Sequence, residues 1–289
     1  MLALGTVQFG QSYGIANKTG QVKPHEIKLI LNKAQEFGID TIDTATTYGD
    51  SEKSLGNAGV KDWKIVTKIP EIPFYKNKAE LRRWLRNSIE QSLKRLRIET
   101  LYGVLLHRPN QLLDDGYNSV WDELNSLKES GLIQKIGYSI YNPSELDDLF
   151  ALYKPTIIQA PYNIFDRNLE VSGWLKKLFE NNIEVHTRSC FLQGLLLMNP
   201  SDRPSNLNKW QEIWDTYDKW IKKNNISRLE ACLSFVTSEK RISKIVIGVD
   251  NLKQFQEITS LIETKRNIKF LDFNVSDEGL INPSKWISS

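Results

Sequence analysis

The sequence predicts a single (β/α)8 TIM barrel, an α/β fold in which eight parallel strands alternate with helices around one closed sheet. Short apolar runs rich in β-branched residues recur along the 289 residues, and most are flanked by segments with the apolar spacing of helices. Right-handed crossovers between successive strands would close such a sheet. The eight expected strands are Leu2–Thr6, Ile39–Ile42, Lys64–Thr67, Leu101–Leu106, Lys135–Ser139, Thr156–Gln159, Ile183–His186 and Lys244–Ile247.

The segments between these strands carry the start and stop signals of amphipathic helices. Pro24 begins the first helix at a position where its missing N–H costs nothing, and Gly38 follows the helix in the usual place for glycine. The segment Leu81–Leu96 has apolar side chains on one face and Arg, Glu, Gln and Lys on the other, so one side packs on the sheet. Shorter apolar stripes begin at Leu146 and Leu252.

An open doubly wound sheet is the rival fold. It would show a glycine-rich phosphate turn leading from the first strand into a helix. Here Gly5-Thr-Val-Gln-Phe-Gly10 is followed by Gln-Ser-Tyr-Gly rather than by a helix, so we reject this fold. No Pro/Ser linker divides the chain, and we expect one domain over residues 1–289. Two longer irregular stretches, 108–116 and 190–207, follow strands and are the expected substrate loops.

Composition and charge narrow the partners. The chain is 40% hydrophobic and 25% charged, as in ordinary soluble globular proteins. Its net charge of +3 is small and its basic residues are interspersed with acidic ones, which argues against nucleic-acid binding. We find no bilayer-spanning run, no signal peptide, and no Cys/His cluster at metal-ligand spacing. Cys190 and Cys232 make no disulfide framework, so we expect a cytoplasmic protein without metal or membrane partner.

Polar residues stand at or just after the ends of three expected strands. They are Asp43 and Tyr48 in Asp43-Thr-Ala-x-x-Tyr48-Gly-x-Ser-Glu52, Lys68 after Val66-Thr, and His107 in Leu105-Leu-His107-Arg-Pro109. β/α barrels carry their chemistry at this end of the sheet. The set comprises a phenol that donates a proton, a cation that lowers its pKa, a carboxylate that holds the cation, and a neutral hydrogen-bonding ring. Each residue alone has an ordinary structural interpretation, but all four in order predict a site that reduces a carbonyl.

The order, spacing and types of these residues resemble the aldo-keto reductase family. The resemblance extends over nearly the whole chain, from Leu4-Gly-Thr6 to Leu280-Ile-Asn-Pro-Ser-Lys285. It implies that Tyr48 is the general acid, that Lys68 paired with Asp43 activates it, and that His107 orients the carbonyl oxygen. It also implies hydride transfer with NADPH or NADH, without metal, on a small carbonyl substrate.

The same resemblance implies a cofactor site built from several strand ends. Ser139 and Gln159 would hydrogen-bond the nicotinamide carboxamide, the segment from Arg188 would wrap the pyrophosphate, and the segment from Gly248 would hold the adenosine. The full set of implied cofactor-binding residues is Gly5, Thr6, Val7, Asp43, Ser139, Gln159, Arg188, Ser189, Gln193, Gly194, Leu195, Gly248, Val249, Asp250, Asn251, Gln254 and Glu257.

The chain departs from the family pattern beside the nicotinamide. Ile140 stands where the family usually has Asn, which removes one carboxamide hydrogen bond. Arg188 stands where the family often has an aromatic residue that stacks on the nicotinamide, and a planar guanidinium can also stack on a ring.

A third departure concerns the 2′-phosphate that distinguishes NADPH from NADH. Gly248, Asp250 and Gln254 occupy the positions of the usual basic residues. Asp250 would repel a phosphate and accept a hydrogen bond from a ribose 2′-OH instead. Lys253 or Lys244 could compensate, so both cofactors remain possible.

The beginning of the chain, Leu-Gly-Thr-x-Gln-Phe-Gly-x-x-Tyr-Gly-Ile, resembles bacterial reductases found with surface-polysaccharide biosynthesis. A sugar or sugar-derived carbonyl is therefore the leading substrate. Two alternatives stay open: an NAD-linked sugar dehydrogenase, and a nucleotide-sensing regulatory barrel without catalysis. The sequence leaves the physiological substrate, the direction of reaction and the oligomeric state undetermined.

Overall fold

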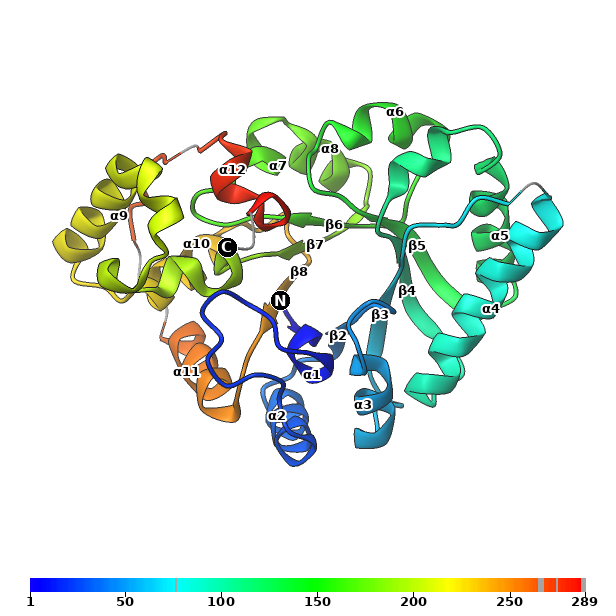
Figure 1. Cartoon of the computed structure of the whole chain (residues 1–289), viewed down its shortest axis with the longest axis horizontal. Helices are drawn as coiled ribbons and strands as arrows, with labels where there is room; N and C mark the ends of the chain where they lie inside the picture. The colour runs from blue at the N-terminus through cyan, green and yellow to red at the C-terminus, as the bar shows by residue number, and fades with distance from the viewer. Residues whose placement is uncertain (76, 265–267, 274, 287–289) are drawn as a thin grey trace.

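The computed structural model describes residues 1–75, 77–264, 268–273 and 275–286, so the last three residues of the predicted domain 1–289 lie outside it. A closed barrel of eight parallel strands, in sequence order, forms its centre (Figure 1). The barrel prediction is confirmed, and strand ends differ from the expected ones by one or two residues. The strands are β1 Leu2–Gly5, β2 Thr41–Asp43, β3 Lys64–Ile69, β4 Leu101–Leu106, β5 Ile133–Ser139, β6 Ile157–Pro161, β7 Glu184–Arg188 and β8 Lys244–Gly248.

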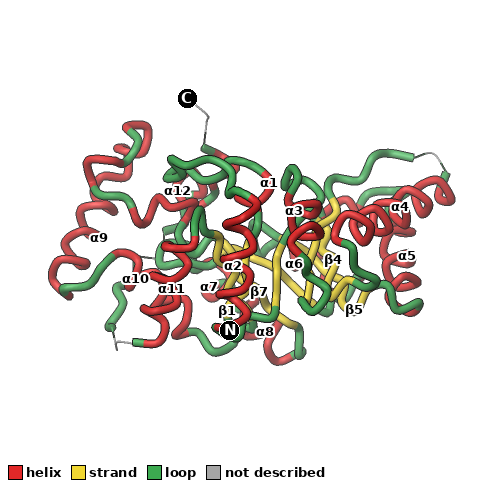
Figure 2. The backbone as a smooth tube through the Cα atoms, turned by 90° about the horizontal axis from the view of Figure 1, so that it is seen from below, coloured by secondary structure: helices red, strands yellow, loops and turns green. Residues whose placement is uncertain are grey.

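Helices surround the strands on the outside (Figure 2). Helix α2 begins at Pro24 and is followed by Gly38 at φ +80°, as predicted. Helix α4 begins after Asn77, whose side chain accepts a hydrogen bond from the N–H of Ala79 at 2.8 Å. The α-helices are α1 Val7–Gly10, α2 Pro24–Glu36, α3 Ser51–Ala58, α4 Lys78–Leu96, α5 Asn118–Glu129, α6 Glu145–Leu152, α7 Asn168–Val171, α8 Trp174–Glu180, α9 Gln211–Asn224, α10 Arg228–Ser238, α11 Leu252–Glu263 and α12 Glu278–Ile281.

The interior of the barrel is apolar and closely packed. Val66, Leu105 and Ile157 form a buried apolar cluster there, separate from the main core between sheet and helices. A Cβ on Gly137 would lie 1.6 Å from the carbonyl oxygen of Ile157, so β5 and β6 can pair there only through glycine.

The N-terminal end of the barrel is filled by charged side chains rather than by hydrocarbon. Asp40 pairs with Lys64 at 2.7 Å and with Lys244 at 2.5 Å. Glu184 pairs with Lys135 and lies 2.6 Å from the ring of the fully buried His186. Residues at this end of a β/α barrel usually contribute to the stability of the fold rather than to catalysis. The cluster also fixes Lys244 at the end opposite the chemistry.

The two expected substrate loops are not irregular throughout. The stretch 108–116 contains the 3₁₀ helix Pro109–Leu113, and 190–207 contains Leu192–Leu197, Pro200–Asp202 and part of Ser205–Trp210; a fifth 3₁₀ turn, Pro283–Lys285, follows α12. Proline at the first position favours such turns at three of these places. Gln111 also joins the first loop to the segment after β3, because its amide both donates to and accepts from the backbone of Ile72.

Across the described ranges, we find no helix with the length and apolar character needed to cross a membrane.

Candidate active site

The buried Lys68 contacts two of the other three predicted polar residues, Asp43 and Tyr48. The Nζ atom of Lys68 donates to both carboxylate oxygens of Asp43 at 2.7 Å and to the carbonyl oxygen of Thr44 at 2.9 Å. It also lies 3.3 Å from the hydroxyl oxygen of Tyr48. Lys68 is fully buried and Asp43 is nearly so. A buried lysine keeps its charge only beside such a partner, so the carboxylate holds an ammonium against the phenol.

The pKa values in this group differ from the sequence-based expectation. We predicted that Lys68 lowers the pKa of Tyr48, whereas burial first, and the negative charge of Asp43 second, raise it above its ordinary value. Burial also lowers the pKa of Lys68, and Asp43 opposes that shift. The physical reason is that burial disfavours the charged phenolate and that the carboxylate of Asp43 repels it. The phenol therefore stays protonated in the resting site.

His107 completes the group from the end of β4. Its ring centroid lies 6.3 Å from that of Tyr48, and its backbone N–H donates to the carbonyl oxygen of Ile69 at 3.0 Å. Burial first, and nearby cations second, lower the pKa of His107 to about 3. The ring is thus neutral near pH 7 and has one N–H to donate and one nitrogen to accept.

The turn that carries Tyr48 is held by Ser51 and Glu52, the last two residues of the same motif. The hydroxyl of Ser51 donates to the carbonyl oxygen of Thr6 at 2.8 Å. Glu52 accepts from the hydroxyl of Thr67 and from Arg95 of α4, both at 2.7 Å. These buried bonds tie the ends of β1 and β3 to the N-terminus of α3. They explain why a Ser-Glu pair lies three residues beyond the tyrosine.

Gln159 forms the floor beside this group and carries an unused acceptor. Its Nε2 donates to Asp43 Oδ1 at 2.7 Å, while its Oε1 is buried without a hydrogen-bond partner among the described residues. Ser139, almost fully buried, lies directly opposite Gln159 in the pairing of β5 with β6. An unpaired buried acceptor costs about 1–3 kcal/mol, so a ligand that donates there is favoured. The amide group of a nicotinamide carboxamide has this chemistry.

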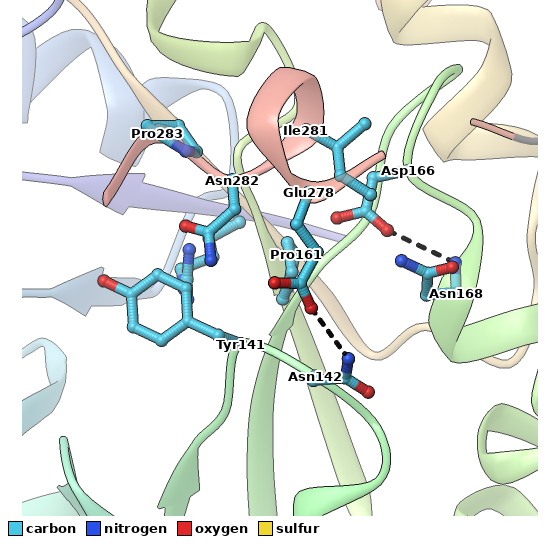
Figure 3. Close-up of a pocket in the computed structure, with 10 residues that line it drawn as sticks. Tyr141, Asn142, Pro161, Asp166, Asn168, Glu278, Ile281, Asn282 and Pro283 are labelled. Atoms are coloured by element: carbon cyan, nitrogen blue, oxygen red, sulfur yellow. Dashed lines mark hydrogen bonds between the residues drawn. The ribbon is translucent and has the colours of Figure 1, made fainter. Parts of the chain in front are cut away.

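Arg188, at the end of β7, extends over the same floor. Its Nη2 donates to the carbonyl oxygen of Ile140 at 3.1 Å, and its guanidinium carbon lies 4.4 Å from the ring centroid of Tyr141. It lines a pocket with Asp166, whose carboxylate accepts from the N–H of Asn168 at 3.2 Å (Figure 3). Burial raises the pKa of Asp166 to about 7.

Comparison with known proteins decides the family. The model of the aldo/keto reductase family matches residues 1–272 of this chain. The chain belongs to the aldo-keto reductase family. It is therefore an NAD(P)H-dependent oxidoreductase that interconverts carbonyl and alcohol groups of small molecules. Within the described residues, no group of three or more His, Cys, Asp or Glu side chains is placed to hold a metal ion.

Its relatives are distant. The uncharacterized oxidoreductase YqkF of Bacillus subtilis is 24% identical, with 82% of each chain covered. The L-glyceraldehyde 3-phosphate reductase of Escherichia coli is 22% identical, with 92% of this chain and 88% of the relative covered. Among solved structures, aldo-keto reductase AKR11C1 from Bacillus halodurans in its holo form has a TM-score of 0.71 at 18% identity, covering 94% of this chain and 89% of the other. The glycerol dehydrogenase AKR11B4 from Gluconobacter oxydans has a TM-score of 0.69 at 23% identity, covering 93% and 87%.

In this aldo-keto reductase, the segment after β7 has a strained backbone. Ser189, Leu192 and Gln193 have φ values of 62°, 48° and 55°, in the left-handed region that favours glycine, and Gly194 follows at 88°. Such strain concentrates at ligand-binding sites. Ser189, Gln193 and Gly194 are partly exposed, whereas Leu195 is buried in the core. The first three can therefore be reached from solvent, whereas Leu195 cannot; pyrophosphate binding by this segment stays a prediction.

The segment between α1 and α2 lies against this turn and against the end of β8. Gln193 contacts it twice, through Ala16 and through the hydroxyl of Tyr13 at 3.2 Å. Asn17 donates from Nδ2 to Asp250 Oδ1 at 3.0 Å. The segment therefore bridges the two stretches that the family uses for pyrophosphate and adenosine.

The N-terminus of α11, which follows the segment implied to hold the adenosine, is already capped by side chains. The N–H of Leu252 donates to Glu26 at 2.9 Å, and the N–H of Gln254 donates to Asn251 at 2.9 Å. Two donors of the first turn are thus already used, because acidic and amide side chains cap the helix. Asp250 also accepts from Gln254 at 3.3 Å. The bond to Asn251 follows the local spacing of an N-cap, whereas the bond to Glu26 joins positions 226 apart and could not be predicted from spacing along the chain.

Other implied cofactor-binding residues serve the framework. The hydroxyl of Thr6, between Gly5 and Val7, donates to the backbone carbonyl oxygen of Asp43 and accepts from the hydroxyl of Ser51, and Val249 is buried. A Cβ on Gly248 would lie 2.7 Å from Gln8, so glycine there admits the Gln8 side chain. Glu257 is exposed on α11. Lys244, one of two lysines expected to replace the missing cation, lies at the opposite barrel end, whereas Lys253 is exposed in α11.

The sequence interpretation missed four residues near the site: Gln8, Asn17, Tyr141 and Asp166. Gln8 lies in the N-terminal Leu-Gly-Thr-x-Gln-Phe-Gly segment, whereas the other three belong to no motif that we identified. Asp166 stands three residues after Asn163, whose side chain accepts from its N–H at 2.9 Å, and this Asx turn was the one local signal available.

Proposed function

We propose that this aldo-keto reductase reduces the carbonyl group of a small hydroxylated substrate, with Tyr48 as the general acid. The observation that carries the proposal is the position of Lys68 Nζ, 3.3 Å from the phenol oxygen and 2.7 Å from both oxygens of Asp43. This arrangement gives the phenol a buried cationic neighbour at its oxygen. A bound reduced nicotinamide would supply the hydride and become a positively charged ring.

The protein groups then have separate tasks. Tyr48 gives its proton to the carbonyl oxygen as negative charge develops there, and the resulting phenolate accepts a hydrogen bond from Lys68. A developing alkoxide is more basic than a phenolate, so a phenol with a raised pKa still transfers its proton. Neutral His107 donates its N–H to the same oxygen and fixes the direction of the carbonyl. Ser139 and Gln159 hold the carboxamide.

The polar side chains around the small pocket beside Arg188 suit the hydroxyl groups of a substrate such as a sugar or sugar derivative. The pocket is lined by carboxylate and amide side chains that accept and donate hydrogen bonds, namely Asn142, Asp166, Asn168, Glu278 and Asn282 (Figure 3). Hydroxyl groups pair with either kind of side chain. The two relatives named for glycerol and for L-glyceraldehyde 3-phosphate act on molecules of this kind by name.

We also propose that NADH serves at least as well as NADPH. Asp250 is held by Asn17 and Gln254 at the position where a 2′-phosphate would need a cation. The carboxylate repels a phosphate and leaves a ribose hydroxyl unaffected.

The test is a side-by-side assay. The binding of NADH and of NADPH is first measured by fluorescence titration. The cofactor that binds more tightly is then mixed with aldoses, hydroxyaldehydes and simple aldehydes, and its oxidation is followed as the loss of the absorbance of the reduced nicotinamide. Turnover of hydroxylated carbonyls above simple ones supports the proposal. Tight binding of cofactor without turnover of any carbonyl would favour the regulatory-barrel alternative, and faster turnover of sugar alcohols with the oxidised form would favour the dehydrogenase.

A further inference from the structure

The guanidinium of Arg188 lies beside the atoms proposed to hold the carboxamide. Arg188 donates to the carbonyl oxygen of Ile140, the residue that follows Ser139. In the pairing of β7 with the neighbouring strand β6, Arg188 lies opposite Pro161, two residues after Gln159. Nη1 donates to Ser189 Oγ at 3.3 Å. These bonds hold the cation next to the Ser139–Gln159 floor. The stacked ring of Tyr141 shows that a planar group can lie against its face.

The positive charge of Arg188 has no carboxylate partner within the described residues. Two acidic side chains line the same pocket. Burial raises the pKa of Asp166 to about 7 although the field of Arg188 lowers it, so the carboxyl is only partly charged near neutral pH, and Glu278 bonds to Asn142 and Lys285. The field of Arg188 lowers the pKa of His107 and of Lys68, so its charge reaches the reacting groups.

This charge acts differently on the two redox states of a nicotinamide. The reduced ring is neutral and the oxidised ring is a cation. An aromatic residue at this position would attract the oxidised ring, because a ring face is negative. A guanidinium repels it by Coulomb interaction and stacks on the neutral ring without that cost. The replacement of an aromatic residue by Arg188 therefore reverses the sign of the preference.

We propose that Arg188 makes this site bind the reduced cofactor more tightly than the oxidised cofactor. The inference rests on the proposed function, because it requires a nicotinamide on the Ser139–Gln159 floor. Its consequence is rapid release of the oxidised product, which suits a reductase. It disfavours the oxidising sugar dehydrogenase.

The test measures dissociation constants of the reduced and oxidised cofactor for the same protein without substrate. Both forms share the adenosine and pyrophosphate, so general damage to the site affects both and leaves their ratio unchanged. In the wild type, we expect the oxidised form to bind about tenfold more weakly. Arg188→Gln should bring the two dissociation constants to about the same value through tighter binding of the oxidised form, and Arg188→Tyr should make the oxidised form bind more tightly than the reduced form. Arg188→Lys keeps the charge and should retain most of the ratio.

Arg108→Gln is the matched control, because Arg108 is an exposed cation whose field, like that of Arg188, lowers the pKa of His107, but it lies in the loop after β4 and not at the end of β7 beside β6. Its ratio should equal that of the wild type. An unchanged ratio in Arg188→Gln, including equal loss of both forms, would overturn the inference while leaving the proposed function intact. Failure of the wild type to bind either form would instead contradict the proposed function.

Discussion

Gln159 donates a hydrogen bond from Nε2 to Asp43 Oδ1 at 2.7 Å, so one amide joins the carboxamide floor to the Asp43–Lys68 pair. The residue that we propose to bind the cofactor is thereby also bonded to the pair that contacts the proposed proton donor, Tyr48. Gln159→Leu should weaken binding of reduced cofactor about tenfold or more, because both the free acceptor and the bond to Asp43 are lost. Titration of the variant with reduced cofactor measures this loss of binding. The value of kcat at saturating cofactor tests whether the bond to Asp43 also matters for proton transfer. Normal kcat at saturation would show that the bond to Asp43 does not matter for proton transfer.

Tyr48→Phe should remove the proton donor and leave the cofactor floor in place. We expect kcat to fall by about 10²–10⁴-fold while the dissociation constant of reduced cofactor stays nearly unchanged. Tyr102→Phe, at the opposite end of the barrel, is the control tyrosine and should keep its kcat. Near wild-type reduction by Tyr48→Phe would refute the assignment of the general acid.

Lys68→Met should abolish turnover and also destabilise the fold, because it leaves Asp43 buried without its cation. Removing one partner of a buried pair costs about 3–5 kcal/mol in the free energy of unfolding. The double variant Asp43→Asn with Lys68→Met should recover most of that stability without recovering activity. Urea denaturation of the single and double variants measures the difference. Equal stabilities for the two would mean that the pair is not coupled.

Asp250→Ser combined with Gln254→Arg should shift preference toward NADPH. The change removes a carboxylate near the expected 2′-phosphate and adds a cation; an uncompensated charge of this kind in a partly screened site is worth about 1–4 kcal/mol. Asn17→Ala, which removes the bond to Asp250 and keeps the carboxylate, separates charge from loop position. Competition between NADH and NADPH provides the measurement. Much tighter NADPH binding by the wild type would show that Lys253 or another cation supplies the contact.

Asp166 predicts a pH-dependent stability. Burial raises its pKa from 3.8 to about 7, so between these values the folded protein keeps a proton that the unfolded chain has released. Stability contributed by this group is fully present below about pH 4 and is lost as the pH rises to about 7. Asp166→Asn should therefore be more stable than the wild type at pH 8, by up to about 4 kcal/mol, and equal to it near pH 4. Asp122→Asn, at a largely exposed aspartate, is the control and should show no such trend.

The sequence predicted the barrel because strand and helix periods are local properties of neighbouring residues. All eight strands, the start of α2 at Pro24 and the polar residues at the strand ends follow from short segments read one at a time. The parts that it did not predict depend on side chains distant in the chain. The bond from Asn17 to Asp250 joins positions 233 apart, and the pairing of Lys244 with Asp40 joins positions 204 apart. The sign of the pKa shift at Tyr48 likewise depends on burial, which no motif states.

The charged cluster around Asp40 and Glu184 lies at the end of the barrel opposite the candidate active site. Substitutions at the base alter ion pairs between strand ends. Substitutions in the 108–116 and 190–207 loops also alter the core, because Leu112, Leu192 and Leu195 of these loops are buried in it. A chimera that transplants these loops onto another barrel must therefore carry their buried leucines with it.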